Sequence, residues 1–278
     1  MEKIKALFKL ARPVTTLSGV FSTVMGGYVA GTGAWLNIAL AALATALISG
    51  AANAWNDYLD IEIDRVNQPR RVLPSGGVSL HTAWRFSLLL TVAAVLLTLL
   101  INVPTFLMAL GSGALLYFYS WKLKSTVLLG NATIALISAL SVVFGGVAAG
   151  NAAPTRWLAL IIGVAILGRE VLKTMADYEG DLSQQCRTVA TVWGQRVSRN
   201  IFYILAAATF VMMMVPYLLR IYSPLYAYIV AIGVYPVLLY ILVRVASDTS
   251  AHQLNRLSQL MKYDYFVWFL AVILGSVH

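Results

Sequence analysis

The chain has 278 residues, of which 60% are hydrophobic and 11% are charged, and its formal net charge is +9. Ordinary soluble domains carry about 25% charged residues. This composition therefore excludes a typical soluble domain and indicates an integral membrane protein. The single cysteine, Cys186, permits no intrachain disulfide.

Nine apolar runs follow one another along the chain. Most have roughly the 17 to 25 residues that a helix needs to cross a bilayer, and the last has only fourteen. In chain order they are residues 14–30, 35–52, 83–101, 104–119, 126–149, 157–175, 201–219, 225–243 and 265–278. Barrel strands would be about ten residues long and would alternate in polarity, whereas these runs are continuous. The predicted fold class is all-α: a multi-pass transmembrane helical bundle of about nine helices, forming a single domain over residues 1–278.

Basic residues gather in alternate connections between these runs. One side holds eighteen of the twenty Lys and Arg residues, and only Arg156 and Arg220 fall on the other. Because Lys and Arg are retained in the cytoplasm, we expect a cell-membrane protein with a cytoplasmic N-terminus and a C-terminus on the opposite side. The positive charge then reflects topology and attraction to anionic lipids, and nucleic acid is not an expected partner.

The first of two acidic clusters lies where the second run ends, on the predicted cytoplasmic side. On a helix that turns about 100° per residue, five of its residues share one face: Asn53, Asn56, Asp57, Asp60 and Asp64. Glu62 points away from this face. Stacked carboxylates raise one another's pKa values unless cations lie between them. The alternative is a merely polar helix end, although a solvated face would normally mix its charges at i,i+4 spacing.

The second cluster lies at the end of the sixth run. Its residues also share a face, with Glu179 pointing away: Arg169, Glu170, Lys173, Asp177 and Asp181. A ladder of i,i+4 ion pairs, such as Lys173 with Asp177, is the structural alternative. Arg169 and Lys173 fall within or at the edge of a membrane span, where ionisable groups are costly and are functional candidates by default.

Carboxylate and amide oxygens of this kind suit Mg²⁺, which binds through a few carboxylates and keeps waters and substrate phosphate oxygens. Basic residues near the clusters could hold a diphosphate: Arg12, Arg65, Arg70, Arg71, Lys122, Lys124, Arg169, Lys173 and Arg187. The sequence has no His or Cys cluster typical of zinc or iron sites. It also lacks a Gly-x-x-x-x-Gly-Lys loop, so use of a nucleoside triphosphate is not indicated.

These motifs carry a resemblance to a known family. Residues 56–65 (NDYLDIEIDR) and 67–76 (NQPRRVLPSG) resemble the first signature of the UbiA superfamily of intramembrane prenyltransferases, and residues 169–181, from Arg169 to Asp181, resemble its second. Residues 119–124 (YSWKLK) and the Glu-Gly-Asp ending of the second motif are most similar to the archaeal-type digeranylgeranylglyceryl phosphate synthases. Arg12-Pro13 also matches many members, but Val14 to Thr16 follow where an Asn is often found, which puts an acceptor contact there in doubt.

The resemblance implies a prenyltransferase with its active site at the cytoplasmic face. Mg²⁺ would be bound by Asn56, Asp60, Asp64, Asp177 and Asp181, with Asn53 and Asp57 as auxiliary ligands. The expected catalytic residues are Asp60, Asp64, Asp177, Asp181 and Lys173. The nine basic residues above would bind a polyprenyl diphosphate, with geranylgeranyl as the expected prenyl group. Its allylic C–O bond would break to give a carbocation.

The acceptor expected from the resemblance is the hydroxyl of geranylgeranylglyceryl phosphate, with its phosphate held by Lys122 and Lys124. Positive-inside topology explains those two lysines equally well. One alternative is a UbiA-type enzyme acting on an aromatic, quinone-precursor or chlorophyllide acceptor. Another is a cation-coupled transporter, although transporters usually place ionisable groups near the bilayer midplane on broken helices. The sequence does not indicate an oligomeric state.

Overall fold

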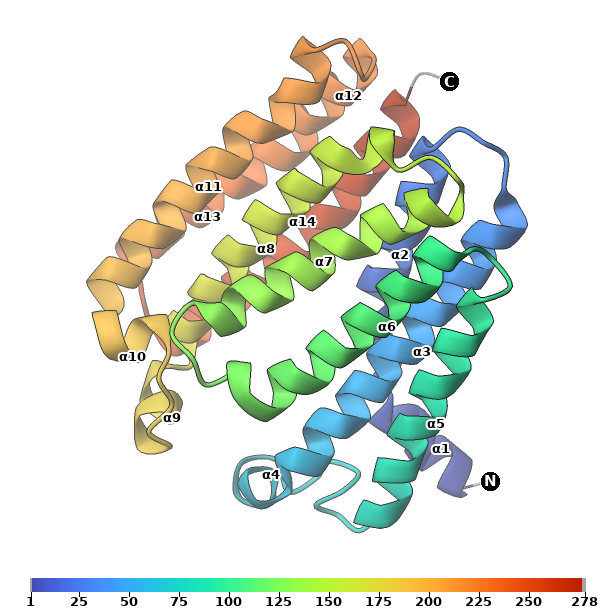
Figure 1. Cartoon of the computed structure of the whole chain (residues 1–278). Coiled ribbons are helices and arrows are strands. Elements are labelled where there is room, and N and C mark those ends of the chain that lie inside the picture. Colours follow the sequence, from blue (N-terminus) through green and yellow to red (C-terminus); the bar gives the residue numbers. More distant parts are fainter. Residues whose placement is uncertain (1, 277–278) are drawn as a thin grey trace. The chain divides into compact units, whose positions relative to one another are not determined.

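The computed structural model describes residues 2–276, with only the backbone described for Val66 and Asn67. Within this part of the chain the regular structure is helical (Figure 1), apart from one isolated antiparallel bridge between Tyr222 and Ser276. The prediction of an all-α fold is confirmed. Asn67 of the first motif lies at the end of a helix, and only its backbone is described. The last two residues of the ninth predicted run lie outside the described residues.

The helices of the first half are α1 (Glu2–Leu10), α2 (Pro13–Val29), α3 (Trp35–Leu59), α4 (Ile61–Asn67), α5 (Leu80–Thr98), α6 (Val103–Phe118) and α7 (Leu129–Ala148). Those of the second half are α8 (Arg156–Ala176), α9 (Tyr178–Ser183), α10 (Val189–Trp193), α11 (Gln195–Leu218), α12 (Pro224–Ile229), α13 (Tyr235–Ser247) and α14 (Ala251–Gly275). Short π-helical turns at Tyr119–Leu123 and Val230–Val234 extend α6 and join α12 to α13. A 3₁₀ turn at Ala153–Thr155 precedes α8.

Seven helical segments within the described residues are long and apolar enough to cross a membrane: α3, α5, α6 with its π-turn, α7, α11, α12 to α13, and α14. The protein is thus a multi-pass membrane protein. Two further predicted spans form α2, which has only 17 residues, and α8, which contains charged residues of the second acidic cluster. The expected total of nine spans and the orientation of the termini stay predictions.

The ninth predicted run was placed wrongly at its start. It was expected to begin at Tyr265, but α14 begins at Ala251, where the Ser250 hydroxyl accepts a hydrogen bond from the backbone N–H of Gln253. Polar residues in the first half of α14 lower its mean hydropathy, so this part of the helix does not form a continuous apolar run. Several of them, including Gln253 and Ser258, are buried against other helices. The sequence pattern does not reveal those neighbouring helices, so it does not predict a helix there.

Helix ends follow local chemistry elsewhere too. Ser79 and Asn102 accept hydrogen bonds from the backbone N–H groups of Thr82 and Thr105 at the starts of α5 and α6. Short polar side chains at this position satisfy N–H groups that have no partner within the helix. Arg12 turns the chain between α1 and α2 in a left-handed conformation with φ 49°, directly before Pro13.

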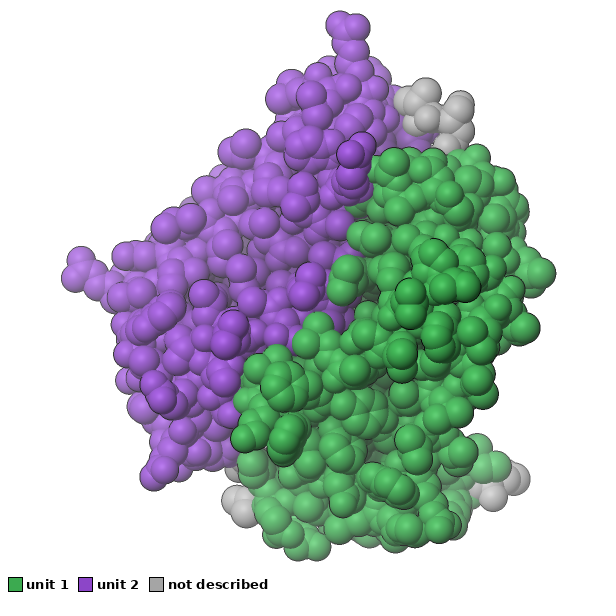
Figure 2. Space-filling model, viewed as in Figure 1, with its two compact units in different colours: residues 1–123, 140–155 green, residues 124–139, 156–278 purple. Residues whose placement is uncertain are grey.

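The chain divides into two compact units (Figure 2): residues 1–123 with 140–155, and residues 124–139 with 156–278. The first unit contains the first acidic cluster, and the second unit contains the second cluster. The expectation of a single domain over residues 1–278 stays a prediction.

The first unit is built on α3, which packs against α2, α5 and α6. Alanines form the buried face of α3, and Ala41, Ala44, Ala51 and Ala54 have no exposed surface. Glycines allow a closer approach where α2 meets the last part of α7. A Cβ atom at Gly145 would lie 1.8 Å from the carbonyl oxygen of Thr23. Small residues at such crossings are typical of membrane helices, because close backbone packing replaces the hydrophobic drive that lipid removes.

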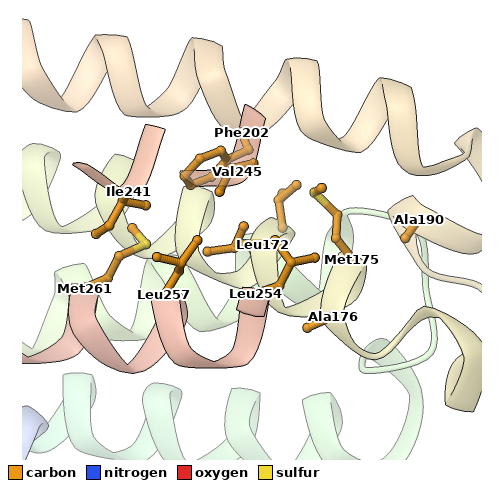
Figure 3. Packing of buried hydrophobic residues seen from close by; sticks show 11 residues of the cluster. Leu172, Met175, Ala176, Ala190, Phe202, Ile241, Val245, Leu254, Leu257 and Met261 are labelled. Atoms are coloured by element: carbon orange, nitrogen blue, oxygen red, sulfur yellow. The ribbon is translucent and has the colours of Figure 1, made fainter. Parts of the chain in front are cut away.

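In the second unit, α8 packs against α11 and α14. Leu172, Met175, Phe202 and Leu257 are among the buried side chains that fill the space between these helices and α13 (Figure 3). Arg169 adds a polar tie, since its Nε donates a hydrogen bond of 3.1 Å to the carbonyl oxygen of Ser258 on α14. The acidic end of α8 is therefore connected to a well-packed helical core.

The outward faces of the long helices are apolar. Leu89 on α5, Ile204 on α11 and Val243 on α13 are each about two-thirds exposed (67%, 68% and 66%). In water such surfaces would favour association, whereas in a bilayer they contact hydrocarbon. Their position is consistent with the membrane spans identified above.

The crossing of α2 and α7 predicts a difference between two glycine variants. Gly145→Ala places its Cβ against the backbone of α2 and should lower the free energy of unfolding by about 1–3 kcal/mol. Gly111→Ala on α6 is the matched control, because no atom lies within 4 Å of its added Cβ. Thermal unfolding in detergent measures both; equal melting temperatures for the two variants would contradict the packing described for α2 and α7.

Candidate functional site

Both acidic motifs contain a bend between two helices. Asp60 separates α3 from α4 with φ −91° and ψ 8°, and Asp177 separates α8 from α9 with φ −90° and ψ 6°. The i→i−4 backbone ladder continues through each bend, since the N–H groups of Asp64 and Asp181 donate to the carbonyl oxygens of Asp60 and Asp177 at 2.8 Å. Each pair of carboxylates is therefore held one turn apart at the end of a membrane-length helix.

In the first motif, arginines neutralise two buried carboxylates. Asp57 forms an ion pair with Arg12, and its Oδ1 lies 3.7 Å from Nη1 of Arg71. The same nitrogen of Arg71 donates to both carboxylate oxygens of Asp64, at 2.8 and 2.7 Å. The side chains of Asp57 and Asp64 are only 4% and 7% exposed. The cations required between stacked carboxylates are thus supplied by the α1–α2 corner and the α4–α5 loop.

The remaining residues of this predicted face have other partners. Nδ2 of Asn56 donates to Oδ2 of Asp60 at 2.9 Å, which ties the first two expected metal ligands together. Nδ2 of Asn53 donates instead to the carbonyl oxygen of Ala11 at 3.0 Å. Asn53 and Asp57, expected as auxiliary ligands, therefore contact the α1–α2 corner in this structure, and their role toward a metal stays a prediction.

Glu62 lies on the opposite side of α4, as predicted. Its side chain is 77% exposed and pairs with Arg65 at 2.8 Å. The structure thus does not bring Arg65 to the acidic face, while Arg70 in the next loop is exposed. Lys122 is exposed and lies 5.1 Å from the ring centroid of Trp121. The expected diphosphate-binding roles of these basic residues stay predictions.

In the second motif, Glu170 is the centre of an ion-pair group. Its oxygens contact Nη1 of Arg169 at 3.0 Å and Nζ of Lys173 at 3.1 Å, and its side chain is 11% exposed. The ion-pair alternative suggested Lys173 with Asp177, but Lys173 pairs with Glu170 one turn earlier. The ammonium group of Lys173 is therefore held near the acids by a buried carboxylate. Sequence reasoning placed Glu170 on the face without giving it this holding role.

The two aspartates of the second motif titrate above their usual range. Burial raises the pKa of Asp177, with a further increase from Glu170, and Lys173 opposes both. Burial also raises the pKa of Asp181 to about 6; the charge of Asp177 adds to this, whereas a hydrogen bond with Thr188 and the charge of Lys173 oppose it. Asp177 keeps an exposed surface, so desolvation there comes from protein packed around part of the side chain.

Thr188 was not selected from the sequence. Its side chain caps α10 by accepting from the backbone N–H of Thr191, and it also contacts Asp181. A Thr-x-x-Thr pattern at the start of a short apolar helix is a recognisable capping signal. The pattern does not indicate that Thr188 also lies near Asp181, seven positions earlier.

The donor types in these motifs fit Mg²⁺, because they are carboxylate and amide oxygens. Across the residues that the structure describes, no three Asp, Glu, His or Cys side chains converge into a group that could hold a metal alone. Mg²⁺ usually keeps several waters and uses one or two carboxylates plus substrate phosphates. Each motif thus offers a partial set of ligands of the kind that a phosphorylated ligand completes.

Comparison with known proteins adds an independent finding. The model of the UbiA prenyltransferase family matches residues 19–270. A digeranylgeranylglyceryl phosphate synthase from Methanopyrus kandleri is 34% identical over 77% of this chain and 79% of its own length. A protein of the same name from Methanothermobacter thermautotrophicus is 30% identical over 96% of this chain and 95% of its own.

Solved structures agree with the fold. One described as digeranylgeranylglyceryl phosphate synthase has a TM-score of 0.82 and 28% identity, and covers 99% of both chains. A UbiA homologue from Archaeoglobus fulgidus bound to GPP and Mg²⁺ has a TM-score of 0.72, at 18% identity over 96% of this chain and 99% of its own. At that identity the second comparison shows a shared fold.

The pKa of Asp181 predicts a pH-dependent release of protons. With a pKa of about 6, its carboxyl is half protonated near pH 6 and ionised at pH 8, and a metal binds only the ionised form. Mg²⁺ titrations followed by calorimetry in buffers of different ionisation enthalpy should show proton release at pH 6 and little at pH 8. Asp181→Asn should remove most of it. Equal release at both pH values would argue against Asp181 as a ligand.

Proposed function

Because the chain belongs to the UbiA prenyltransferase family, we propose that it transfers a geranylgeranyl group from its diphosphate to the hydroxyl of geranylgeranylglyceryl phosphate, in a reaction that depends on Mg²⁺. The observation that carries this proposal is the 30% identity to a digeranylgeranylglyceryl phosphate synthase over 96% of the chain. Membership in a family of enzymes argues against the transporter alternative.

The two acidic motifs supply the metal ligands in this proposal. Asn56, Asp60 and Asp64 would hold Mg²⁺ at the first motif, and Asp177 and Asp181 at the second. Bound Mg²⁺ would stabilise the negative charge that grows on the leaving diphosphate. The hydrogen bond between Asn56 and Asp60 and the helical turn between Asp177 and Asp181 support this assignment, because they hold the expected ligands in fixed pairs.

Basic side chains would bind the diphosphate directly. Lys173 is a suitable group, since Glu170 holds its ammonium beside the second motif while 40% of the side chain remains exposed. As the allylic C–O bond breaks, its electron pair leaves with the diphosphate, and Lys173 would contact that developing charge. Arg12, Arg71 and Arg169, each with a carboxylate partner in the structure, are further candidates, together with the exposed Arg65, Arg70 and Arg187.

The acceptor hydroxyl completes the reaction. Its oxygen forms a new C–O bond with the allylic carbocation, and its proton is released. We assign the phosphate of the acceptor lipid to Lys122 and Lys124, which follow the end of α6 and are close in sequence. Their position on the predicted cytoplasmic side supports contact with a lipid headgroup.

Substitution of one aspartate in each acidic motif tests the metal assignment. Asp60→Asn and Asp177→Asn should each lower kcat by at least about 100-fold, because each removes a charged metal ligand beside the leaving group. Glu62→Gln and Glu179→Gln are the matched controls. Each removes an exposed carboxylate two residues after the tested aspartate and should retain activity. The protein of each variant must show the wild-type melting temperature. Normal turnover in Asp60→Asn or Asp177→Asn would overturn the assignment.

A panel of acceptors tests the substrate. Purified protein with Mg²⁺ and labelled geranylgeranyl diphosphate is expected to alkylate geranylgeranylglyceryl phosphate, and EDTA should abolish the product. Homogentisate, 4-hydroxybenzoate and chlorophyllide, offered separately, should give no product. Transfer to one of these instead would keep the prenyltransferase chemistry and replace the proposed acceptor.

A further inference from the structure

A single arginine occupies both oxygens of a predicted metal ligand. Nη1 of Arg71 donates to Oδ1 and Oδ2 of Asp64 at 2.8 and 2.7 Å, and the Asp64 side chain is almost fully buried. A divalent cation on the same oxygens would lie beside a group that is always positively charged. Because like charges at that separation repel, Arg71 in this position weakens the binding of a metal to Asp64.

The chain contains an internal comparison for this position. Residues 60–77 align without a gap with residues 177–194, which lie 117 positions later in the chain. The identical pairs are Asp60/Asp177, Glu62/Glu179, Asp64/Asp181, Gln68/Gln185, Arg70/Arg187, Val72/Val189 and Gly77/Gly194. The first aspartate of each segment has nearly the same φ and ψ, and the same backbone hydrogen bond joins it to the second. We infer that the two segments are sequence repeats whose backbones match at the helical bend and differ beyond it, since residues 189–193 form α10 whereas residues 72–76 form turns.

The repeats differ at the residue seven positions after the second aspartate. This residue is Arg71 in the first repeat, where its guanidinium pairs with Asp64 at 2.7 Å. It is Thr188 in the second repeat, where its hydroxyl caps α10 and lies near Asp181. A hydroxyl is neutral and does not repel a cation. The group at this position is therefore neutral beside Asp181 and charged beside Asp64. The cation nearest the second motif, Lys173, is paired with Glu170 instead.

The surroundings of Arg71 allow its side chain to move without refolding the loop. Its backbone N–H donates to Gln68 at 2.9 Å, its carbonyl oxygen accepts from Ser75 at 3.0 Å, and Leu73 in the same loop is buried. The guanidinium end is less constrained, with the side chain 34% exposed. If Arg71 leaves, Asp57 keeps its ion pair with Arg12, so that buried carboxylate still has a cationic partner.

We propose that Arg71 is an exchangeable counter-ion, which neutralises Asp64 in the metal-free protein and moves to the substrate diphosphate when Asp64 binds Mg²⁺. Guanidinium groups bind carboxylates and phosphates with similar charge-assisted hydrogen bonds, so the exchange replaces one anionic partner with another. This inference rests on the proposed function. Its consequence is that, without diphosphate, the second motif binds a divalent cation more tightly than the first.

Mn²⁺ binding by the full chain in detergent, followed by electron paramagnetic resonance, tests the exchange without any acceptor. The wild type should show one tighter and one weaker Mn²⁺ site. Arg71→Thr places the second repeat's residue in the first and should tighten the weaker site about ten-fold, the effect of losing one charge-assisted hydrogen bond. Thr188→Arg makes the reciprocal change and should weaken the tighter site.

The variants also differ in their expected affinity for a diphosphate. With Mn²⁺ and geranylgeranyl thiodiphosphate as an unreactive probe, Arg71→Thr should bind the probe about ten-fold more weakly than the wild type, although it binds the metal alone more tightly. Arg85→Thr is the charge-matched control: Arg85 is exposed on α5, and neither affinity should change. Arg71→Gln serves as a second variant if Arg71→Thr has a lowered melting temperature.

The outcomes separate this inference from the proposed function. If the wild type binds two Mn²⁺ ions but neither Arg71 variant tightens the weaker site, Arg71 is a structural partner of Asp64 and the exchange is wrong. Weaker Mn²⁺ binding in those variants would also overturn it. If the wild type binds neither Mn²⁺ nor the thiodiphosphate, the proposed function itself fails.

Discussion

Neutralisation of buried carboxylates is the constraint on which the first unit depends. Asp57 and Asp64 lie at the end of α3 and on α4, in a chain whose neighbouring segments are built to contact lipid. Removing an unpaired carboxylate from water is costly, so these two aspartates require fixed cations. Arg12 and Arg71 supply them, and to do so the α1–α2 corner and the α4–α5 loop must both fold against the helix end.

The packing of the unit follows from that requirement. Leu10 before the corner and Leu73 and Val78 in the loop are buried in one cluster with Ala54 of α3. Arg12 adopts a left-handed backbone conformation at the turn, which non-glycine residues rarely adopt. The apolar cluster fixes the backbone on both sides, and the arginine side chains extend from it to the aspartates. Hydrophobic burial and ion pairing thus stabilise the same pair of connections.

The second unit solves the same problem with a different arrangement. There Glu170 is the buried carboxylate, paired with Arg169 and Lys173 inside the helical ladder of α8, while Asp177 and Asp181 stand beyond it with raised pKa values. Because the two segments align in sequence, the partners of their carboxylates can be compared position by position. The two segments share the helical bend and the spacing of their aspartates, but they balance charge differently, and the exchange proposed for Arg71 would give them different metal affinities.

The sequence by itself determined the helical membrane fold, the approximate position of most spans, the two acidic motifs and the outward direction of Glu62. These features depend on composition and on the helical period, which are local properties. It failed at the start of α14, because the polar residues there are buried by neighbours that a linear pattern does not reveal.

Only the tertiary structure decided which cation pairs with which acid. Arg12 is 45 positions from Asp57, and no periodicity relates them. Lys173 could have paired with Asp177 or with Glu170 by spacing alone. Such pairings are set by how corners and loops pack against helix ends, and the energy of that packing is spread over residues distant in the chain.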